Sequence, residues 1–133
     1  MGALLTLHSL VRWIIVLVAL VALVKFTRDW LRRANPNSMD RGLMSGFSGL
    51  MDLQALLGII FLLWGGFTGI GFPEFRLAHG GLMLVAAAVA HLPMRWRNQA
   101  GPLVLRNNAL VIVAVLIIVI LGVGIPLGWY RWT

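Results

Sequence analysis

The sequence contains no cysteine and only four acidic residues among its 133 positions. Without cysteine, disulfides, catalytic thiolates and zinc–thiolate centres are excluded. The sequence also lacks a glycine-rich phosphate loop, a nucleophile–base pair, a carboxylate pair and the usual spacing of a protein metal centre. We therefore expect no independent catalytic activity, because any chemistry would have to come from a bound cofactor.

Polar residues are scarce as well. Apolar residues make up 60% of the chain and charged residues 11%, and the mean hydropathy is +0.92. Soluble domains carry about twice that share of charge. The net charge of +7 does not indicate nucleic-acid binding, because the cations lie between apolar runs, where they orient membrane helices.

Four apolar runs account for most of the length. A helix needs about 20 mainly apolar residues to cross a hydrocarbon core of about 30 Å. The runs predict one domain with transmembrane spans at about 4–26, 50–72, 77–95 and 107–130. The first run reaches this length if its helix extends back through Arg12 and His8 or onward past Lys25, and we favour the extension through His8. We expect this helix to be retained rather than cleaved as a signal peptide. The turn formers of residues 34–49 predict a loop before the second span.

The distribution of cations predicts the orientation. Eight cations fall on one side of the predicted spans: Lys25, Arg28, Arg32, Arg33, Arg41, Arg95, Arg97 and Arg106. The other side has Arg12, Arg76 and Arg131. The positive-inside rule then places both termini outside, in a bacterial inner (cytoplasmic) membrane. Because short connections make successive helices antiparallel, we predict an all-α, up-down bundle of four transmembrane helices.

Histidines next to arginines are the most informative polar residues. His8 and His79 fall on the predicted outer side, at the starts of spans one and three. A b-type haem is commonly held by two imidazoles from different helices, and a guanidinium pairs well with a haem propionate. His8 and His79 are therefore candidate iron ligands, with Arg12 and Arg76 as propionate partners. The alternative is that both histidines are interfacial residues bonded to water, backbone or lipid headgroups.

The predicted cytoplasmic side offers no second pair of histidines. His91 lies twelve residues after the histidine that opens span three, which rotates it by roughly 120° and separates it by about 18 Å along the helix. We expect His91 to anchor the helix end with Arg95 and Trp96. Asp52 begins span two on the same side, and we expect it to pair with Arg95, Arg97 or a loop cation.

The predicted midplane of the bilayer is uncharged. It lies near Val18, Leu62, Val85 and Leu116, and no ionisable side chain falls at these levels. Transport pathways usually place polar or ionisable residues there, so conduction or proton-coupled transport by a monomer is disfavoured. Gly65 and Gly69 have the spacing of a close helix–helix contact.

Three segments carry a resemblance to a known group of proteins: LHSLVRW (7–13), DLQALLGIIFLLWGG (52–66) and FRLAHGGLMLVAAAVAHLPMRWR (75–97). They resemble small bacterial four-span membrane proteins that are usually labelled cytochrome b-like or uncharacterised. In those proteins a His-Ser pair followed by Arg-Trp opens the first span, as do His8, Ser9, Arg12 and Trp13 here.

The third span of that group opens with Arg, then an acid and His before a Met. Arg76, His79 and Met83 match this pattern, with Ala78 in place of the acid. The second span of the group often begins with a His, where this chain has Asp52. The resemblance implies a four-span fold and a haem-associated role, and the departure at Asp52 removes one further candidate ligand.

Two functions remain open from the sequence. The first is a small electron-transfer protein with one haem b held by His8 and His79. The second is a cofactor-free accessory subunit of a larger respiratory or photosynthetic membrane complex. In either case the expected partners are the lipid bilayer and a larger membrane complex or further copies of this chain, without nucleic acid.

Overall fold

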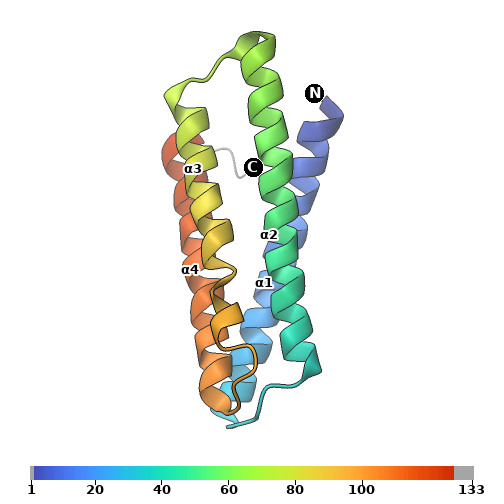
Figure 1. The fold of residues 1–133 in the computed structure, drawn as a ribbon, viewed down its shortest axis with the longest axis vertical. Helices are drawn as coiled ribbons and strands as arrows, with labels where there is room; N and C mark the ends of the chain where they lie inside the picture. Colours follow the sequence, from blue (N-terminus) through green and yellow to red (C-terminus); the bar gives the residue numbers. More distant parts are fainter. Residues whose placement is uncertain (1, 128–133) are drawn as a thin grey trace.

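A computed structural model describes residues 2–127 and forms an up-and-down bundle of four long helices (Figure 1). The helices are α1 (Gly2–Leu31), α2 (Ser38–Gly65), α3 (Glu74–Val89) and α4 (Pro102–Leu127). A π-helix at Gly66–Ile70 continues α2, and a 3-10 helix at Leu92–Arg95 follows α3. Four helical segments are long and apolar enough to cross a membrane. The predicted fold class is confirmed, and the chain is a multi-pass membrane protein.

The helices follow one another around the bundle. α1 contacts α2 and α4, and α3 contacts the same two neighbours. α1 and α3, which carry His8 and His79, therefore lie on a diagonal. One end of the bundle holds the start of α1 and the α2–α3 connection (Figure 1); we call it the histidine end. The opposite end, with residues 32–37 and 90–101, is called the basic end.

The first helix extends back through Arg12 and His8, as favoured from the sequence, and also onward past Lys25. It begins at Gly2 and continues past Lys25 to Leu31. Lys25 can lie within it because its ammonium group bonds to two carboxylates, Asp29 Oδ2 at 2.6 Å and Asp40 Oδ1 at 2.5 Å. Arg131, the third predicted cation of the opposite side, lies outside the described residues.

The prediction of a loop at 34–49 was wrong over most of its length, because α2 begins at Ser38. Asn37 caps the helix: its side chain accepts from the Asp40 backbone N–H, while the Asp40 carboxylate accepts from the Asn37 N–H. This reciprocal capping box satisfies two backbone donors that a helix start otherwise leaves unpaired. Met44 and Phe47, one turn apart, then point into the core.

The spacing of Gly65 and Gly69 does not form a helix contact. Gly69 has a φ of 120° within a kink, and a Cβ built on it would meet nothing within 4 Å. The second span therefore ends as an irregular turn toward α3. At the other end of the molecule, the helix of span three stops at Val89 rather than 95, since Pro93 lies in the 3-10 helix that follows.

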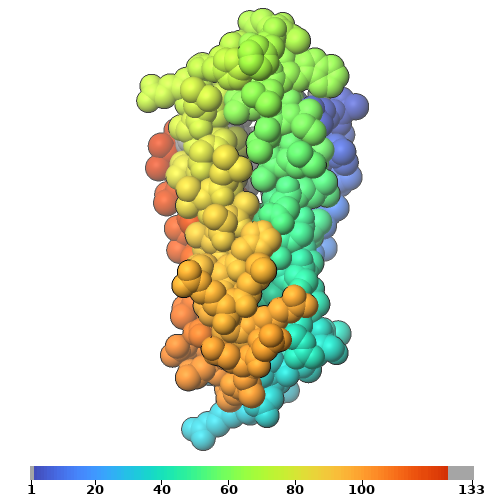
Figure 2. Space-filling view, in the orientation of Figure 1, coloured from blue at the N-terminus to red at the C-terminus, as the bar shows by residue number. Residues whose placement is uncertain are grey.

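The apolar core is concentrated toward the basic end. Its largest fully buried apolar side chains are Phe26, Phe47, Leu105, Ile112 and Val115. Figure 2 shows the segment of residues 90–101 lying against this part of the bundle. Between Leu57 and Ala86, by contrast, Gly65 is the one buried residue. The histidine end also contains the buried Val11 of α1 and Val123 of α4, and His8 and His79 are half-buried at this end.

Candidate functional site

His8 lies on α1 against a glycine of α2. A Cβ built on Gly58 would come within 3.4 Å of His8 Cε1. One turn earlier, Gln54 Nε2 donates to the His8 backbone carbonyl at 2.9 Å. The glycine thus leaves room for the imidazole, and the glutamine ties α2 to α1 at the same level. His8 is half-buried as a result.

Two buried polar atoms at this level have no hydrogen-bond partner among the residues that the structure describes. They are His8 Nδ1 and Gln54 Oε1. Leaving a buried donor or acceptor unpaired costs about 1–3 kcal/mol, and native proteins rarely tolerate it without a reason. Both atoms lie in the sparsely packed part of the bundle, so the polar interior there is incomplete.

His79 lies on α3 and is oriented by α4. Its Nδ1 is 2.9 Å from the Gly122 carbonyl oxygen. Because a carbonyl only accepts, Nδ1 carries the proton and Nε2 keeps its lone pair. Metal-ligating histidines typically show this arrangement, in which the second ring nitrogen donates to a fixed acceptor.

Gly122 permits this contact because it has no side chain. A Cβ there would overlap the methyl group of Met83 and would lie 3.2 Å from Leu82 Cβ. α3 and α4 therefore approach closely at Gly122, and this approach brings the carbonyl oxygen to the His79 ring. The position of His79 depends on helix packing as well as on its own side chain.

His8 and Arg12 of α1 and His79 of α3 all lie toward the histidine end of the bundle. His8 interacts electrostatically with His79, and the charge of Arg12 acts on both imidazoles. The Arg12 guanidinium also lies 5.1 Å from the centre of the Trp13 ring. Two imidazoles from diagonal helices and one guanidinium thus share the interior of the histidine end.

Arg76 has a different environment. Its Nη1 donates to the Gly71 carbonyl at 3.0 Å and its Nη2 to the Phe61 carbonyl at 3.1 Å. The guanidinium lies 5.5 Å from the centre of the Phe61 ring and against Gly65, whose Cβ would be 2.9 Å from Nη2. Arg76 therefore closes the α2–α3 turn, and its role at a propionate stays a prediction.

The prediction that Asp52 pairs with Arg95, Arg97 or a loop cation was wrong. Its carboxylate contacts His91 Nε2, with distances of 2.8 Å to Oδ1 and 3.0 Å to Oδ2. His91 was likewise expected to group with Arg95 and Trp96, but it faces α2 because α3 ends just before it. This pair is partly exposed, and Asp52 lies on α2 two residues before Gln54, the residue that bonds to the His8 backbone carbonyl.

Sequence reasoning missed the strongest polar contacts of the basic end. Lys25 bridges α1 to the start of α2 through Asp40, whose side chain is 1% exposed. Trp96 Nε1 donates to Asn108 Oδ1 at 2.7 Å, and this bond joins the α3–α4 connection to α4. The capping pattern of Asn37 and Asp40 is visible in the sequence and indicates that a helix starts beside Asp40. The bond between Trp96 and Asn108 has no such local signal, because it depends on tertiary packing alone.

Within residues 2–127, no cluster of three or more histidine, aspartate or glutamate side chains is placed to hold a metal ion. A pair of imidazoles suits an iron whose other four ligands come from a porphyrin. No model of a known protein family, no curated protein and no solved structure matches the chain. The resemblance to the cytochrome b-like group therefore stays a prediction.

Proposed function

We propose that this chain binds one haem b at the histidine end, where His8 and His79 would hold its iron, and takes part in electron transfer. The observation that carries the proposal is the presence of two half-buried histidines, on diagonal helices, toward the same end of the bundle.

The residues present fit such a group by two criteria. His79 already donates its Nδ1 proton to the Gly122 carbonyl, which leaves Nε2 as the ligand atom. His8 and Gln54 each have a buried polar atom without a partner among the described residues. These are the features that a site shows when part of its interior is supplied by a bound molecule.

Each side chain then has a distinct task. The two imidazoles hold the iron from opposite helices, and Gly122 fixes the orientation of His79. Arg12, whose charge acts on both imidazoles, is suited to pair with a propionate through two hydrogen bonds. When bound, the haem supplies one-electron transfer, while the surrounding apolar helices exclude water and tune the potential.

The orientation follows from charge. The eight cations of the basic end favour the cytoplasmic side of a bacterial inner membrane, so the haem site faces the outer side. Electrons would then be exchanged with a partner at the outer surface or within the bilayer. A larger membrane complex or another copy of this chain is the expected context.

A visible spectrum of the purified protein, recorded before and after dithionite, tests the proposal. The cells should be grown with ample haem. We expect a sharp reduced α-band that disappears in His8→Ala and in His79→Ala. The matched control is His91→Ala, which removes a histidine of the basic end and should leave the band unchanged.

A colourless protein from haem-replete cells would contradict the proposal. The remaining function would then be the cofactor-free accessory subunit, and native gels after mild detergent extraction would test it. Migration with a much larger complex supports that role, whereas migration only as a small homo-oligomer excludes it.

A further inference from the structure

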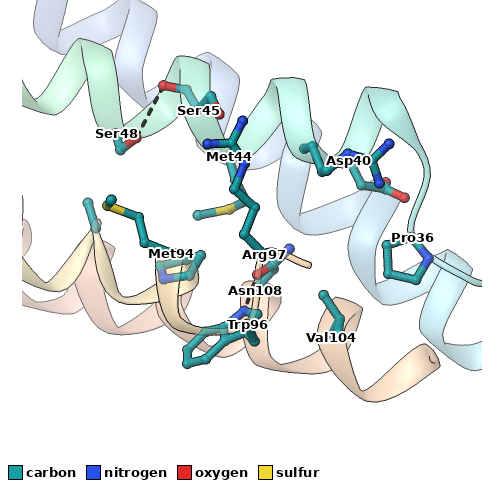
Figure 3. Close-up of a pocket in the computed structure, with 13 residues that line it drawn as sticks. Pro36, Asp40, Met44, Ser45, Ser48, Met94, Trp96, Arg97, Val104 and Asn108 are labelled. Carbon is teal, nitrogen blue, oxygen red and sulfur yellow. Dashed lines mark hydrogen bonds between the residues drawn. The ribbon is translucent and has the colours of Figure 1, made fainter. Parts of the chain in front are cut away.

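A cleft opens at the basic end, between the first half of α2 and the α3–α4 connection (Figure 3). Arg41 and Ser45 line it from α2, and Trp96 and Arg97 line it from the connection. The side chain of Arg97 extends across the cleft toward α2 (Figure 3). Two guanidinium groups from separate parts of the chain therefore border one depression, remote from the histidine end.

The acidic residues near this cleft are already paired. Asp40 lines the cleft and bonds to Lys25. Asp29 bonds to Lys25 and also contacts Arg28, and Asp52 contacts His91. Among residues 2–127, neither cleft arginine makes a hydrogen bond or ion pair through its side chain with another residue. The cleft therefore carries positive charge that the protein itself does not neutralise.

Backbone and hydroxyl groups add to the positive electrostatic potential of the cleft. α2 begins at Ser38, so the positive end of its dipole lies beside Arg41, where a cation is unfavourable and an anion is favoured. Ser45 is exposed and its hydroxyl can donate to an oxygen in the cleft. A tetrahedral oxyanion with several acceptor oxygens matches two guanidinium forks and a hydroxyl.

The apolar part of the cleft identifies the source of that oxyanion. Met44 and Val104 are buried within its lining, and Met94, at its edge, is 68% exposed. The cleft also lies where the apolar helices end, which is the depth of lipid headgroups. A soluble phosphate would make no use of these apolar contacts, whereas the glycerol and first acyl carbons of a phospholipid would.

We propose that this cleft binds the phosphate group of an anionic phospholipid, with Arg41 and Arg97 as its two cationic contacts. Basic pockets at helix ends on the cytoplasmic side commonly take such headgroups. Inorganic phosphate shares the chemistry, but it lacks the part of the ligand that Met94 and the cleft floor contact.

Native mass spectrometry of the full-length protein in mild detergent tests this site. The protein is titrated with phosphatidylglycerol, with phosphatidylcholine and with inorganic phosphate at about 0.15 M salt, where distant surface charges are screened. We expect one tightly retained phosphatidylglycerol per chain. The double variant Arg41→Gln/Arg97→Gln should bind it about thirtyfold more weakly, since each cation contributes about a fivefold change.

The matched control is Arg28→Gln/Arg32→Gln, which removes two cations from the same end without touching the cleft lining. It should change phosphatidylglycerol affinity far less. Equal losses in both double variants, or no loss in either, would overturn the proposal. Inorganic phosphate that binds as tightly as the lipid would overturn the assignment of a lipid source.

A folding defect is separated from a binding defect by Arg41→Lys/Arg97→Lys. This variant keeps both charges and loses the planar fork, so it should recover the part of the affinity that depends on charge and bind more tightly than the glutamine variant. Failure of the lysine variant to recover binding, in a protein that elutes as the parent does, would contradict an electrostatic site. The haem spectrum should be unchanged throughout, so the two proposals fail independently.

Discussion

At the basic end, Phe26, Phe47 and Leu105 are fully buried and the Lys25–Asp40 ion pair is enclosed between two helices. At the histidine end, by contrast, Gly65 is the one buried residue between Leu57 and Ala86. The first region is completed by its own side chains. In the second, among residues 2–127, His8 Nδ1 and Gln54 Oε1 are buried without a hydrogen-bond partner, which is the pattern of a site that another molecule completes.

The surroundings of the glycines also differ between the two ends. At the histidine end, Gly58 lies against His8, Gly65 against Arg76 and Gly122 against Met83. At the basic end, Cβ atoms on Gly42 and Gly46 would meet nothing within 4 Å. Glycine therefore makes space for functional side chains at one end, whereas at the other it fills no such role.

The largest effect should come from the enclosed ion pair of the basic end. Lys25→Met leaves the Asp40 carboxylate, whose side chain is 1% exposed, without a cation. Breaking such a pair costs about 3–5 kcal/mol. Arg28→Met is the control, since Arg28 is 56% exposed and an exposed pair contributes about 0–1 kcal/mol. Thermal unfolding in detergent measures both, and equal shifts would refute the contrast.

Trp96→Phe should cost about 1–3 kcal/mol, because it leaves the buried Asn108 oxygen without its donor. Trp13→Phe provides a comparison at an exposed position of the histidine end and should stay within about 0.5 kcal/mol. Chemical unfolding in mixed micelles distinguishes them. If the two variants have the same unfolding midpoint, the hydrogen bond from Trp96 to Asn108 does not stabilise the basic end.

Gly122→Ala tests the close contact of α3 with α4. Its Cβ would overlap Met83 and crowd Leu82, and such overpacking typically costs about 1–3 kcal/mol. The same change should displace the carbonyl that orients His79 and shift the haem spectrum.

Gly46→Ala is the matched control for this change and has the opposite expected sign. Its Cβ meets nothing, and alanine in a helix interior is more stable than glycine by about 0.5–1 kcal/mol. Destabilisation by both substitutions would mean that glycine does not serve different purposes at the two ends.

The smallest effect should come from Asp52→Asn. The Asp52 and His91 side chains are 55% and 38% exposed, so their pairing contributes about 0–1 kcal/mol and weakens with salt. Unfolding midpoints at low and high salt measure it. A large loss of stability, or any change in the haem spectrum, would show that the basic end is coupled to the site.

Much of this architecture could be predicted from hydrophobic runs and helix rise. The extension of α1 back through His8 could be favoured from the sequence, since the charge-free part was too short to cross a bilayer. The start of α2 was missed because Gly and Ser in residues 41–49 indicate a loop, although the Asn37–Asp40 capping box marks a helix. Local side-chain bonding outweighed composition there.

The candidate site could be predicted only in part. Residue type and topology were enough to place His8, His79 and Arg12 toward the same end of the bundle. Sequence spacing could not show that Arg76 would be taken by the carbonyls of Phe61 and Gly71. It also could not show that Asp52 would meet His91, because that contact depends on where α3 stops.

Hydrogen exchange followed by mass spectrometry, with and without haem, tests the central claim most directly. Amides of residues 40–51, at the basic end, should exchange slowly in both states. Amides of residues 54–65 and 79–86 should exchange faster without haem and become protected when haem is bound. Equal protection of both ends without haem, with no change on its addition, would contradict the account.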